Sequence, residues 1–215
     1  VYDSPEYVKD MGTPDRYYSV TEDIRTGRVS ARNLQRKQRA IFLDRDGVIN
    51  QYRGFIRSAE EFELIDGVGE AIKCINESGY LAIIVTNQPV IARGEVTWEE
   101  LQTIHNKMET LLGEHGAYID DIFICPHHPD KGFEGERLEY KIDCDCRKPK
   151  PGMLFQAAEK YNIDLNDSWM VGDDMRDIQA GKSAGCKTAL IGREAEGQYC
   201  NLNQFIQTIM ENKKW

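Results

Sequence analysis

The chain has 215 residues, of which 40% are hydrophobic and 29% are charged, a composition typical of a globular protein with one ample domain or one domain plus an appendage. A formal net charge of −9 without a basic stripe argues against a nucleic-acid partner. No apolar run approaches the roughly 18 residues of a membrane span, and no basic start precedes an apolar core, so we expect neither a membrane partner nor a secretory signal.

The first 38 residues differ in composition from the rest of the chain. Residues 2–14 are polar and rich in turn-forming residues, and a short helix is predicted over residues 15–26. A basic segment follows, and we expect its end, residues 32–39, to be a solvated linker. We therefore predict an appendage at residues 1–38 and a main domain at residues 39–215.

From residue 39 onwards, predicted strands alternate with predicted helices. The strands are continuous apolar runs, as expected when both faces of a sheet are covered. The helices carry end signals, such as the capping box of Thr97 with Glu100 and the stop at Gly79. This alternation predicts a doubly wound, Rossmann-like α/β fold with a mainly parallel sheet. The predicted strands are 40–43, 80–85, 119–125, 168–171 and 186–191, and the predicted helices are 68–78, 97–113, 151–161, 175–184 and 202–212.

Two acids, Asp44 and Asp46, follow the first of these strands and lead into a glycine turn. If the strand continues through them, both carboxylates lie on one side of it, because side chains repeat every two residues. Paired acids at the end of a buried strand are costly unless a cation or a reaction requires them. We interpret Asp44 as a nucleophile and Asp46 as its acid/base partner. The alternative is a solvated Asp-Gly turn.

Four polar clusters occupy strand ends or strand-to-helix loops, and the topology of a doubly wound sheet brings them to one edge. Acids from two strands can hold Mg²⁺ through oxygen ligands, while a threonine hydroxyl and a lysine suit phosphoryl oxygens. An aspartate that forms an aspartyl-phosphate is an established solution for phosphoryl transfer. For the last cluster alone, helix N-capping is the alternative. The clusters are Asp44 to Gly47, Thr86 to Gln88, Arg147 to Gly152, and Gly172 to Asp174 with Asp177 one turn further.

In order, these clusters resemble the four motifs of the haloacid dehalogenase (HAD) superfamily of phosphatases, over about residues 39–195. The resemblance implies that Asp44 attacks phosphorus, and that Asp46 protonates the leaving group and then activates water. It also implies that Thr86 and Lys148 bind the phosphoryl group.

The same resemblance implies a magnesium cofactor. Mg²⁺ would be held by the Asp44 side chain, the Asp46 backbone carbonyl and Asp173, and Asp174 is a further candidate. The short stretch between the first two motifs leaves no room for a large cap domain, so short loops must select the substrate.

A second constellation joins Cys125 and His127 to Cys144 and Cys146 across a polar loop. Thiolate and imidazole ligands in a closed set of four suit structural Zn²⁺, and the loop between them has few apolar residues with which to order itself. The alternative is a set of reduced loop cysteines beside two surface histidines. The clustering indicates a metal site in a reducing, cytoplasmic compartment. The pattern matches the zinc loop of histidinol-phosphate and heptose-bisphosphate phosphatases, which implies His127 rather than His128 as the ligand.

Within the superfamily, residues 42–50, 91–94, 125–129 and 144–149 resemble the D-glycero-D-manno-heptose 1,7-bisphosphate 7-phosphatases most. The resemblance implies a small sugar-phosphate substrate, whose 7-phosphate is hydrolysed in nucleotide-activated heptose biosynthesis. A second phosphate could meet an arginine bidentately, although a solvated loop cation is the alternative for Arg93. The candidate substrate-binding residues are Asn87, Gln88, Arg93, Arg147 and Lys148.

Three sites depart from the family pattern: Tyr52, Pro89-Val90 and Glu95-Val96. They bear on the choice of sugar rather than on phosphoryl chemistry. The alternative substrates are histidinol phosphate and other small sugar phosphates, and a superfamily transferase or mutase is a further alternative. An alternative of another class is an inactive regulatory domain of a sugar nucleotidyltransferase, against which the intact motif residues argue.

Residues 6–14 resemble the closing segment of sugar-1-phosphate nucleotidyltransferases. The segment carries no catalytic motif, so we predict no nucleotidyl transfer by this chain. The resemblance implies fusion to an upstream nucleotidyltransferase, which heptose 1-phosphate made here could feed.

Overall fold

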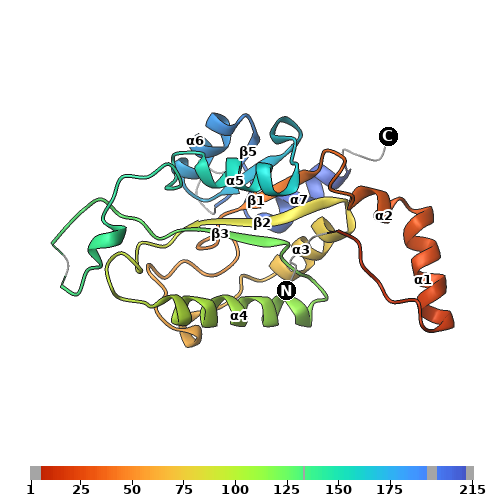
Figure 1. Ribbon diagram of the computed structural model, residues 1–215, viewed down its shortest axis with the longest axis horizontal. Coiled ribbons are helices and arrows are strands. Elements are labelled where there is room, and N and C mark those ends of the chain that lie inside the picture. The colour runs from red at the N-terminus through yellow and green to blue at the C-terminus, as the bar shows by residue number, and fades with distance from the viewer. Residues whose placement is uncertain (1–5, 133, 193–197, 212–215) are drawn as a thin grey trace.

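The computed structural model describes residues 6–132, 134–192 and 198–211. In these ranges, five parallel strands form one sheet in the order β3-β2-β1-β4-β5, with helices on both of its faces (Figure 1). The predicted doubly wound parallel sheet is confirmed. The strands are β1 (Arg39–Leu43), β2 (Tyr80–Asn87), β3 (Asp121–Cys125), β4 (Trp169–Gly172) and β5 (Lys187–Leu190).

The helices follow the predicted alternation, and the Thr97–Glu100 capping box is present at the start of α4. No helix in the described ranges is long and apolar enough to cross a membrane. The α-helices are α1 (Pro14–Arg25), α2 (Arg28–Ala31), α3 (Val68–Glu77), α4 (Trp98–Glu114), α5 (Gly152–Tyr161), α6 (Met175–Ala184) and α7 (Leu202–Glu211), and the 3₁₀ helices are η1 (Ala59–Glu61), η2 (Leu138–Tyr140) and η3 (Leu165–Asp167).

The central strand β1 is apolar because it is covered on both faces. Ile41 and Leu43 pack with residues of α3, α4 and α7, while Ala40 and Phe42 pack with residues of α5 and α6. Full burial of each large side chain stabilises the fold by about 2 kcal/mol. The chain leaves β1 towards β2 on one side and later returns to β4 on the other. Ligands of α/β proteins collect outside the carboxyl ends of the strands at such a switch point.

Long-range pairing shifts the strand boundaries from those predicted. Strand β2 continues through Thr86 and Asn87, which were expected just beyond it, because they pair with the end of β3. Strand β3 begins two residues later than predicted. The Asp120 carboxylate accepts a hydrogen bond from the Ala82 backbone N–H at 2.7 Å and so takes the place of a strand partner there.

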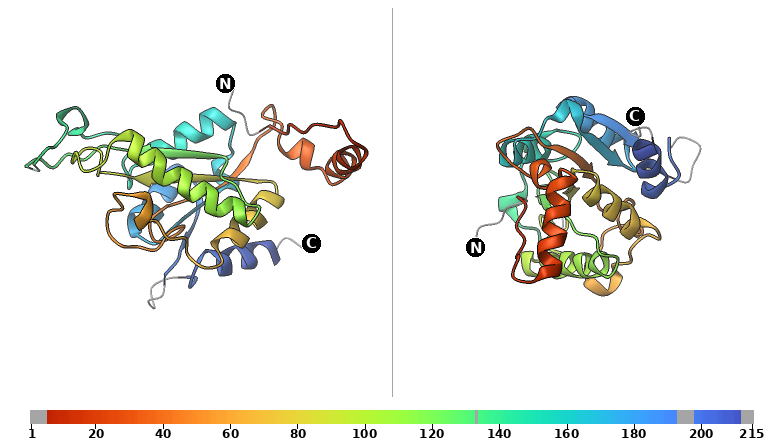
Figure 2. Two further views of the ribbon diagram at one scale, coloured as in Figure 1. Left: turned by 90° about the horizontal axis from the view of Figure 1, so that it is seen from below. Right: turned by 90° about the vertical axis from the view of Figure 1, so that its right-hand side faces the viewer.

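The N-terminal region stands beside the main domain, with α1 at one end of the molecule (Figure 2). The prediction of a solvated linker at residues 32–39 is wrong at Arg32 and at Gln38, whose side chains are buried. The Arg32 side chain is only 6% exposed, and its Nη1 lies 2.5 Å from Oδ1 of Asp120. A buried carboxylate near the start of β3 requires a cation, and the linker supplies it.

Candidate active site

The first two candidate acids reach the site through a turn. Strand β1 ends at Leu43, and the backbone N–H of Asp44 still donates to the Val171 carbonyl of β4 at 3.0 Å. The chain then turns, so that Asp46 faces the site from the turn rather than from a continuing strand. Gly47 permits this turn, because its φ of 83° lies in the left-handed region and an added Cβ would lie 2.0 Å from Oδ2 of Asp173.

A buried lysine lies at the centre of the acids. Lys148 Nζ is 2.9 Å from Oδ1 of Asp44 and 2.7 Å from Oδ1 of Asp177, and it donates to the Val85 carbonyl at 2.8 Å. Burial alone would lower the pKa of Lys148, but the two carboxylates outweigh burial and raise the pKa above its ordinary value. The lysine is therefore a fixed cation, as phosphoryl binding requires.

One ammonium group does not neutralise the acids around it. Burial, reinforced by Asp177, raises the pKa of Asp44 to about 7 despite the nearby Lys148. Burial and the same neighbour raise the pKa of Asp173 to about 6. Carboxylate oxygens of Asp44, Asp173 and Asp177 all lie within 4.8 Å of one another. This excess of negative charge on oxygen donors fits a hard divalent cation such as Mg²⁺.

The second motif lies behind Asp46 and beside the lysine loop. Gln88 is buried, and its Nε2 donates to Oδ2 of Asp46 and to Oγ1 of Thr86, both at 2.9 Å. Asn87 bonds the Lys148 backbone twice, through Nδ2 to the carbonyl at 3.0 Å and through Oδ1 to the N–H at 3.1 Å. The motif thus fixes the positions of Asp46 and of the lysine loop.

These residues surround a cavity of about 350 Å³ at the carboxyl ends of the strands. Arg147 forms part of its wall together with Arg176, a basic residue for which the sequence pattern predicted no role. Arg93 is outside the wall, and its guanidinium lies 4.5 Å from the centre of the Phe55 ring, which does line the cavity. The described residues that line the cavity are Asp44, Asp46, Tyr52, Gly54, Phe55, Asn87, Pro89, Arg147, Lys148, Asp173, Asp174, Arg176 and Asp177.

The four predicted zinc ligands also lie together. Ligand atoms of Cys125, His127, Cys144 and Cys146 are within 4.8 Å of one another, and the shortest pair, Cys125 Sγ and Cys146 Sγ, is 3.2 Å apart. Hydrogen bonding from the other thiols lowers the pKa of Cys146 to about 5, so a thiolate forms readily. Three sulfur atoms and one imidazole nitrogen at this spacing fit tetrahedral Zn²⁺. His128 lies outside this group.

Comparison with known proteins gives the family. The D-glycero-beta-D-manno-heptose-1,7-bisphosphate 7-phosphatase of Pasteurella multocida (strain Pm70) is 44% identical over 155 residues, which are 72% of this chain and 81% of the relative. The enzyme of the same name from Escherichia coli (strain K12) is 42% identical over 154 residues, 72% of this chain and 78% of the relative. The chain belongs to the D-glycero-beta-D-manno-heptose-1,7-bisphosphate 7-phosphatase family.

Two further comparisons agree with this family. A protein-family model described as "HAD-hyrolase-like" matches residues 145–200. A crystal structure of D,D-heptose 1.7-bisphosphate phosphatase from B. bronchiseptica, complexed with magnesium and phosphate, superposes with a TM-score of 0.70. That protein is 34% identical, and the match covers 81% of this chain and 99% of the other. The predicted membership of the HAD phosphatases is confirmed.

Asp177 of this phosphatase belongs to the fourth polar cluster of the sequence, but the sequence pattern predicted no role for it. It is 1% exposed in the first turn of α6, and Gly172 admits it, because an added Cβ would lie 2.2 Å from the Cβ of Asp177. Its place four residues after Asp173 is the available signal. Asp174 instead caps α6, and its carboxylate pairs with the Arg176 guanidinium, 2.9 Å from Nε. The alternative of N-capping therefore applies to Asp174.

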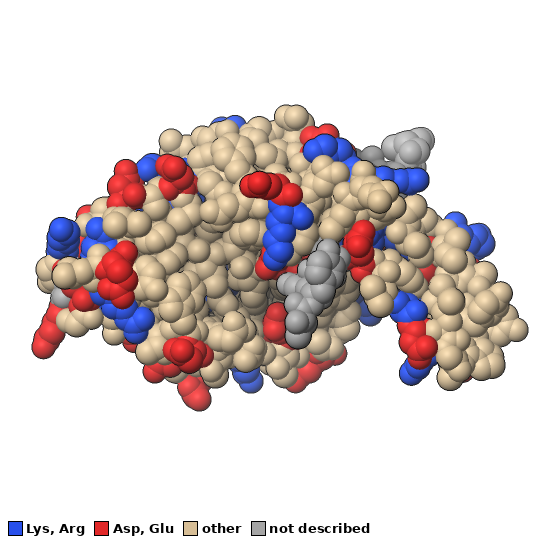
Figure 3. All heavy atoms as spheres, viewed as in Figure 1, with Lys and Arg blue, Asp and Glu red and all other residues tan. Residues whose placement is uncertain are grey.

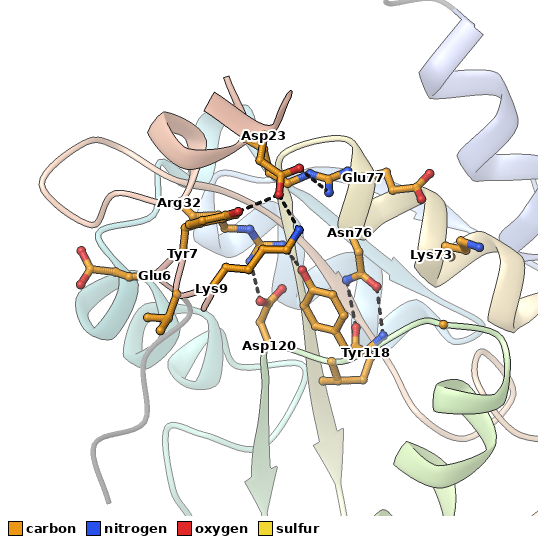
Figure 4. Close-up of a pocket in the computed structure, with 14 residues that line it drawn as sticks. Glu6, Tyr7, Lys9, Asp23, Arg32, Lys73, Asn76, Glu77, Tyr118 and Asp120 are labelled. Carbon is orange, nitrogen blue, oxygen red and sulfur yellow. Dashed lines mark hydrogen bonds and ion pairs between the residues drawn. The ribbon is translucent and has the colours of Figure 1, made fainter. Parts of the chain in front are cut away.

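A second cavity of about 480 Å³ lies near the amino ends of β2 and β3, at the opposite end of these strands from the first cavity (Figure 4). The N-terminal segment forms one wall, where Asp23 accepts hydrogen bonds from Tyr7 at 2.7 Å and from Lys9 at 3.0 Å. Arg32 and Asp120 form another wall.

On the face of the phosphatase seen in Figure 3, acidic and basic side chains are interspersed among uncharged ones.

Proposed function

We propose that the chain is a Mg²⁺-dependent phosphatase that hydrolyses the 7-phosphate of D-glycero-D-manno-heptose 1,7-bisphosphate, in the synthesis of nucleotide-activated heptose for surface polysaccharides. The observation that carries the proposal is the meeting of Asp44, Asp46, Lys148 and Asp173 on the wall of one cavity. The names of the relatives, which are 42–44% identical to this chain, support the substrate.

In the first step, a carboxylate oxygen of Asp44 attacks phosphorus. The bond between phosphorus and the sugar oxygen breaks, and that oxygen takes the electron pair and a proton from Asp46. Lys148, held 2.9 Å from the nucleophile, faces the negative phosphoryl oxygens. Thr86 is proposed to bind the same group.

In the second step, Asp46 removes a proton from water, and the resulting oxygen attacks phosphorus. The bond between phosphorus and Asp44 breaks, which releases phosphate and restores the carboxylate. Mg²⁺, when bound, neutralises phosphoryl charge. The residues that would hold it are Asp44 and Asp173 through their side chains and Asp46 through its backbone carbonyl, and the spacing of the carboxylates supports this set.

We further propose a structural Zn²⁺ on Cys125, His127, Cys144 and Cys146. The Arg147 Nη1 donates to the His127 carbonyl at 3.1 Å, so an ordered metal loop would also hold the residue that precedes Lys148. Free thiols in this cluster support a reducing, cytoplasmic compartment.

Substrate binding by Asn87, Gln88, Arg93 and Arg147 stays a prediction. The position of Arg147 in the cavity wall supports a contact with the second phosphate. The packing of Arg93 on Phe55 supports an indirect role for that arginine.

We also propose that residues 1–38 are an appendage to the phosphatase domain and join it to an upstream nucleotidyltransferase. The resemblance of residues 6–14 to such enzymes and the position of α1 beside the main domain support this division. Nucleotide transfer to a sugar 1-phosphate by the product of the complete reading frame is the expected result, and its absence would contradict the fusion.

The test is phosphate release from heptose 1,7-bisphosphate, hexose phosphates and histidinol phosphate, with and without Mg²⁺. Preference for the heptose bisphosphate is expected. Preference for histidinol phosphate would support the alternative substrate, and no release from any monoester would support a regulatory domain. Asp44→Asn should lower kcat by at least about 10³-fold, because it removes the nucleophile. Appreciable turnover by a zinc-loaded, folded Asp44→Asn protein would exclude Asp44 as the nucleophile.

A further inference from the structure

Arg45 stands between the two proposed catalytic acids, yet its side chain is completely buried. Two nitrogen atoms of its forked guanidinium donate to the carboxylate of Asp46. Nε and Nη2 lie 3.2 and 2.9 Å from Oδ1 of Asp46, and Nη2 lies 3.0 Å from Oδ2. Charge-assisted contacts to both carboxylate oxygens restrain the orientation of the group as well as its position.

The remaining edge of the guanidinium is held from α4. Nη1 of Arg45 lies 3.3 Å from Nε2 of His105, which is only 2% exposed. Burial, reinforced by the arginine, lowers the pKa of His105 to about 4, so the imidazole is neutral at pH 7. Because a guanidinium can only donate, Nε2 accepts and the ring proton is assigned to Nδ1.

Two amides complete the surroundings of the Asp46 carboxylate. Asn50 Nδ2 donates to Oδ1 at 3.1 Å, and Gln88 Nε2 donates to Oδ2 at 2.9 Å. The partners of the Asp46 carboxylate therefore come from the turn itself, from the residue that follows β2 and, through Arg45, from α4. Neither Arg45 nor His105 lines the cavity, and the Arg45 guanidinium contacts Asp46 on one side and His105 on the other.

We propose that Arg45 is a positioning residue that aims Asp46 at the leaving-group oxygen, and that His105 orients Arg45 for this task. This inference rests on the proposed phosphatase function. Proton transfer depends steeply on geometry, and misplacement of a catalytic group by about 1 Å can cost about 10²-fold in rate. Three successive residues thus have three different roles: Asp44 is the nucleophile, Asp46 is the acid/base, and Arg45 positions Asp46.

A purely structural role for the buried pair makes a different prediction. Loss of packing or stability would lower turnover of every substrate by a similar factor. Loss of acid positioning would act on leaving groups that need a proton, such as a sugar alkoxide, and would spare p-nitrophenolate, which leaves without one. The ratio of kcat/KM for the two substrates separates these roles, because kcat/KM reports the steps up to release of the leaving group and excludes hydrolysis of the aspartyl-phosphate.

The experiment compares Arg45→Met, Arg45→Lys, His105→Leu and His105→Gln with the parent protein on the sugar phosphate and on p-nitrophenyl phosphate. Arg45→Met should lose about 10²-fold or more in kcat/KM on the sugar phosphate and less than about tenfold on p-nitrophenyl phosphate. Arg45→Lys keeps the charge without the fork and should shift the ratio in the same direction. His105→Leu should also shift the ratio in this direction, because it removes the acceptor for Arg45. His105→Gln keeps an acceptor, and its ratio should stay close to that of the parent.

The matched control is Arg25→Met, because Arg25 is exposed on α1 and pairs with Glu22. Its ratio should equal that of the parent. Zinc content and the thermal midpoint show whether each variant is folded, and the His105 pair remains informative if Arg45→Met does not fold. Equal losses on both substrates, or none, in the Arg45 and His105 variants would overturn the inference while the parent remains a phosphatase. Failure of the parent to hydrolyse either ester would instead overturn the proposed function.

Discussion

Lys148 Nζ lies closer to Oδ1 of Asp177, at 2.7 Å, than to Oδ1 of Asp44, at 2.9 Å. Asp177 is buried, so its charge acts at short range and with little screening. The lysine is thereby held between a proposed nucleophile and an acid that comes from a different strand–helix connection. The shared ammonium group thus connects the two sides of the cavity.

Substitution of Asp177 should weaken the binding of magnesium. Asp177→Asn keeps the size of the side chain and removes its charge, so Lys148 would pair with Asp44 alone and compete with the metal for it. Loss of a supporting group typically costs about 10–100-fold in metal affinity, and we expect the Mg²⁺ concentration for half-maximal activity to rise by that factor. Activity measured against Mg²⁺ concentration checks this.

Asp174→Asn is the matched control, because Asn still caps α6 and the Asp174 carboxylate pairs with Arg176. Its Mg²⁺ dependence should change by less than about threefold. A parent-like Mg²⁺ dependence in Asp177→Asn would contradict the role given to that residue. A large shift in Asp174→Asn would make Asp174 a ligand or a close supporter of the metal.

Loss of zinc from the Cys125–Cys146 loop should lower both the stability and the activity of the protein. We expect one zinc per chain, and its loss in Cys144→Ser, because a hydroxyl is a poor replacement for a thiolate. The thermal midpoint should fall by about 10 °C, since the metal orders a loop with few apolar residues. Phosphatase activity should fall with it, because Arg147 is bonded to the backbone of His127. Metal analysis, calorimetry and phosphate release measure these three effects.

Cys200→Ser is the control for this change, because Cys200 is exposed and lies outside the cluster. It should keep the zinc, the midpoint and the activity of the parent. A parent protein purified without chelators that contains no zinc, yet is folded and active, would refute the structural role of the metal.

The buried pair of Arg32 with Asp120 should matter for stability and not for catalysis. Arg32→Met removes the cation and leaves a carboxylate that is only 3% exposed without its charged partner. Breaking one side of a buried ion pair costs about 3 kcal/mol, so the free energy of unfolding should fall by that amount. Urea unfolding measures it, and kcat should stay near the parent value.

Arg25→Met again gives the comparison, since its exposed pair with Glu22 is expected to contribute less than about 1 kcal/mol. Similar losses in the two variants would show that burial of Arg32 adds nothing to the stability of the main domain.

The sequence predicted the edge of the sheet at which the polar residues meet, because strand–helix alternation determines that edge. It did not predict the burial of Arg32, because its partner Asp120 lies 88 residues away and is brought near only by the folding of the sheet. The role of Asp177 was not predicted for a related reason. A carboxylate in the first turn of a helix reads as a capping residue, and whether it also faces a lysine from another loop depends on tertiary contacts.

The prediction of strand boundaries and of contacts within the site was limited in the same way. Thr86 and Asn87 follow the apolar run of β2, but pairing with β3 extends the strand through them. The contact of Arg45 with His105 joins residues 60 positions apart, so the motif alone could not indicate it. Local pattern therefore predicted which residues gather, while the pairing of charges inside the cluster needed the three-dimensional structure.

His105 should make stability depend on pH in a defined window. Burial lowers its pKa to about 4 in the folded protein, below the ordinary value of 6.5. Between these values the unfolded chain binds the extra proton, so the stability that is present above pH 6.5 is lost as the pH falls towards 4. The full effect is about 3 kcal/mol. The difference in unfolding free energy between the parent and His105→Gln should therefore change by about that amount between pH 7 and pH 4. A pH-independent difference for His105→Gln would refute a neutral, buried imidazole.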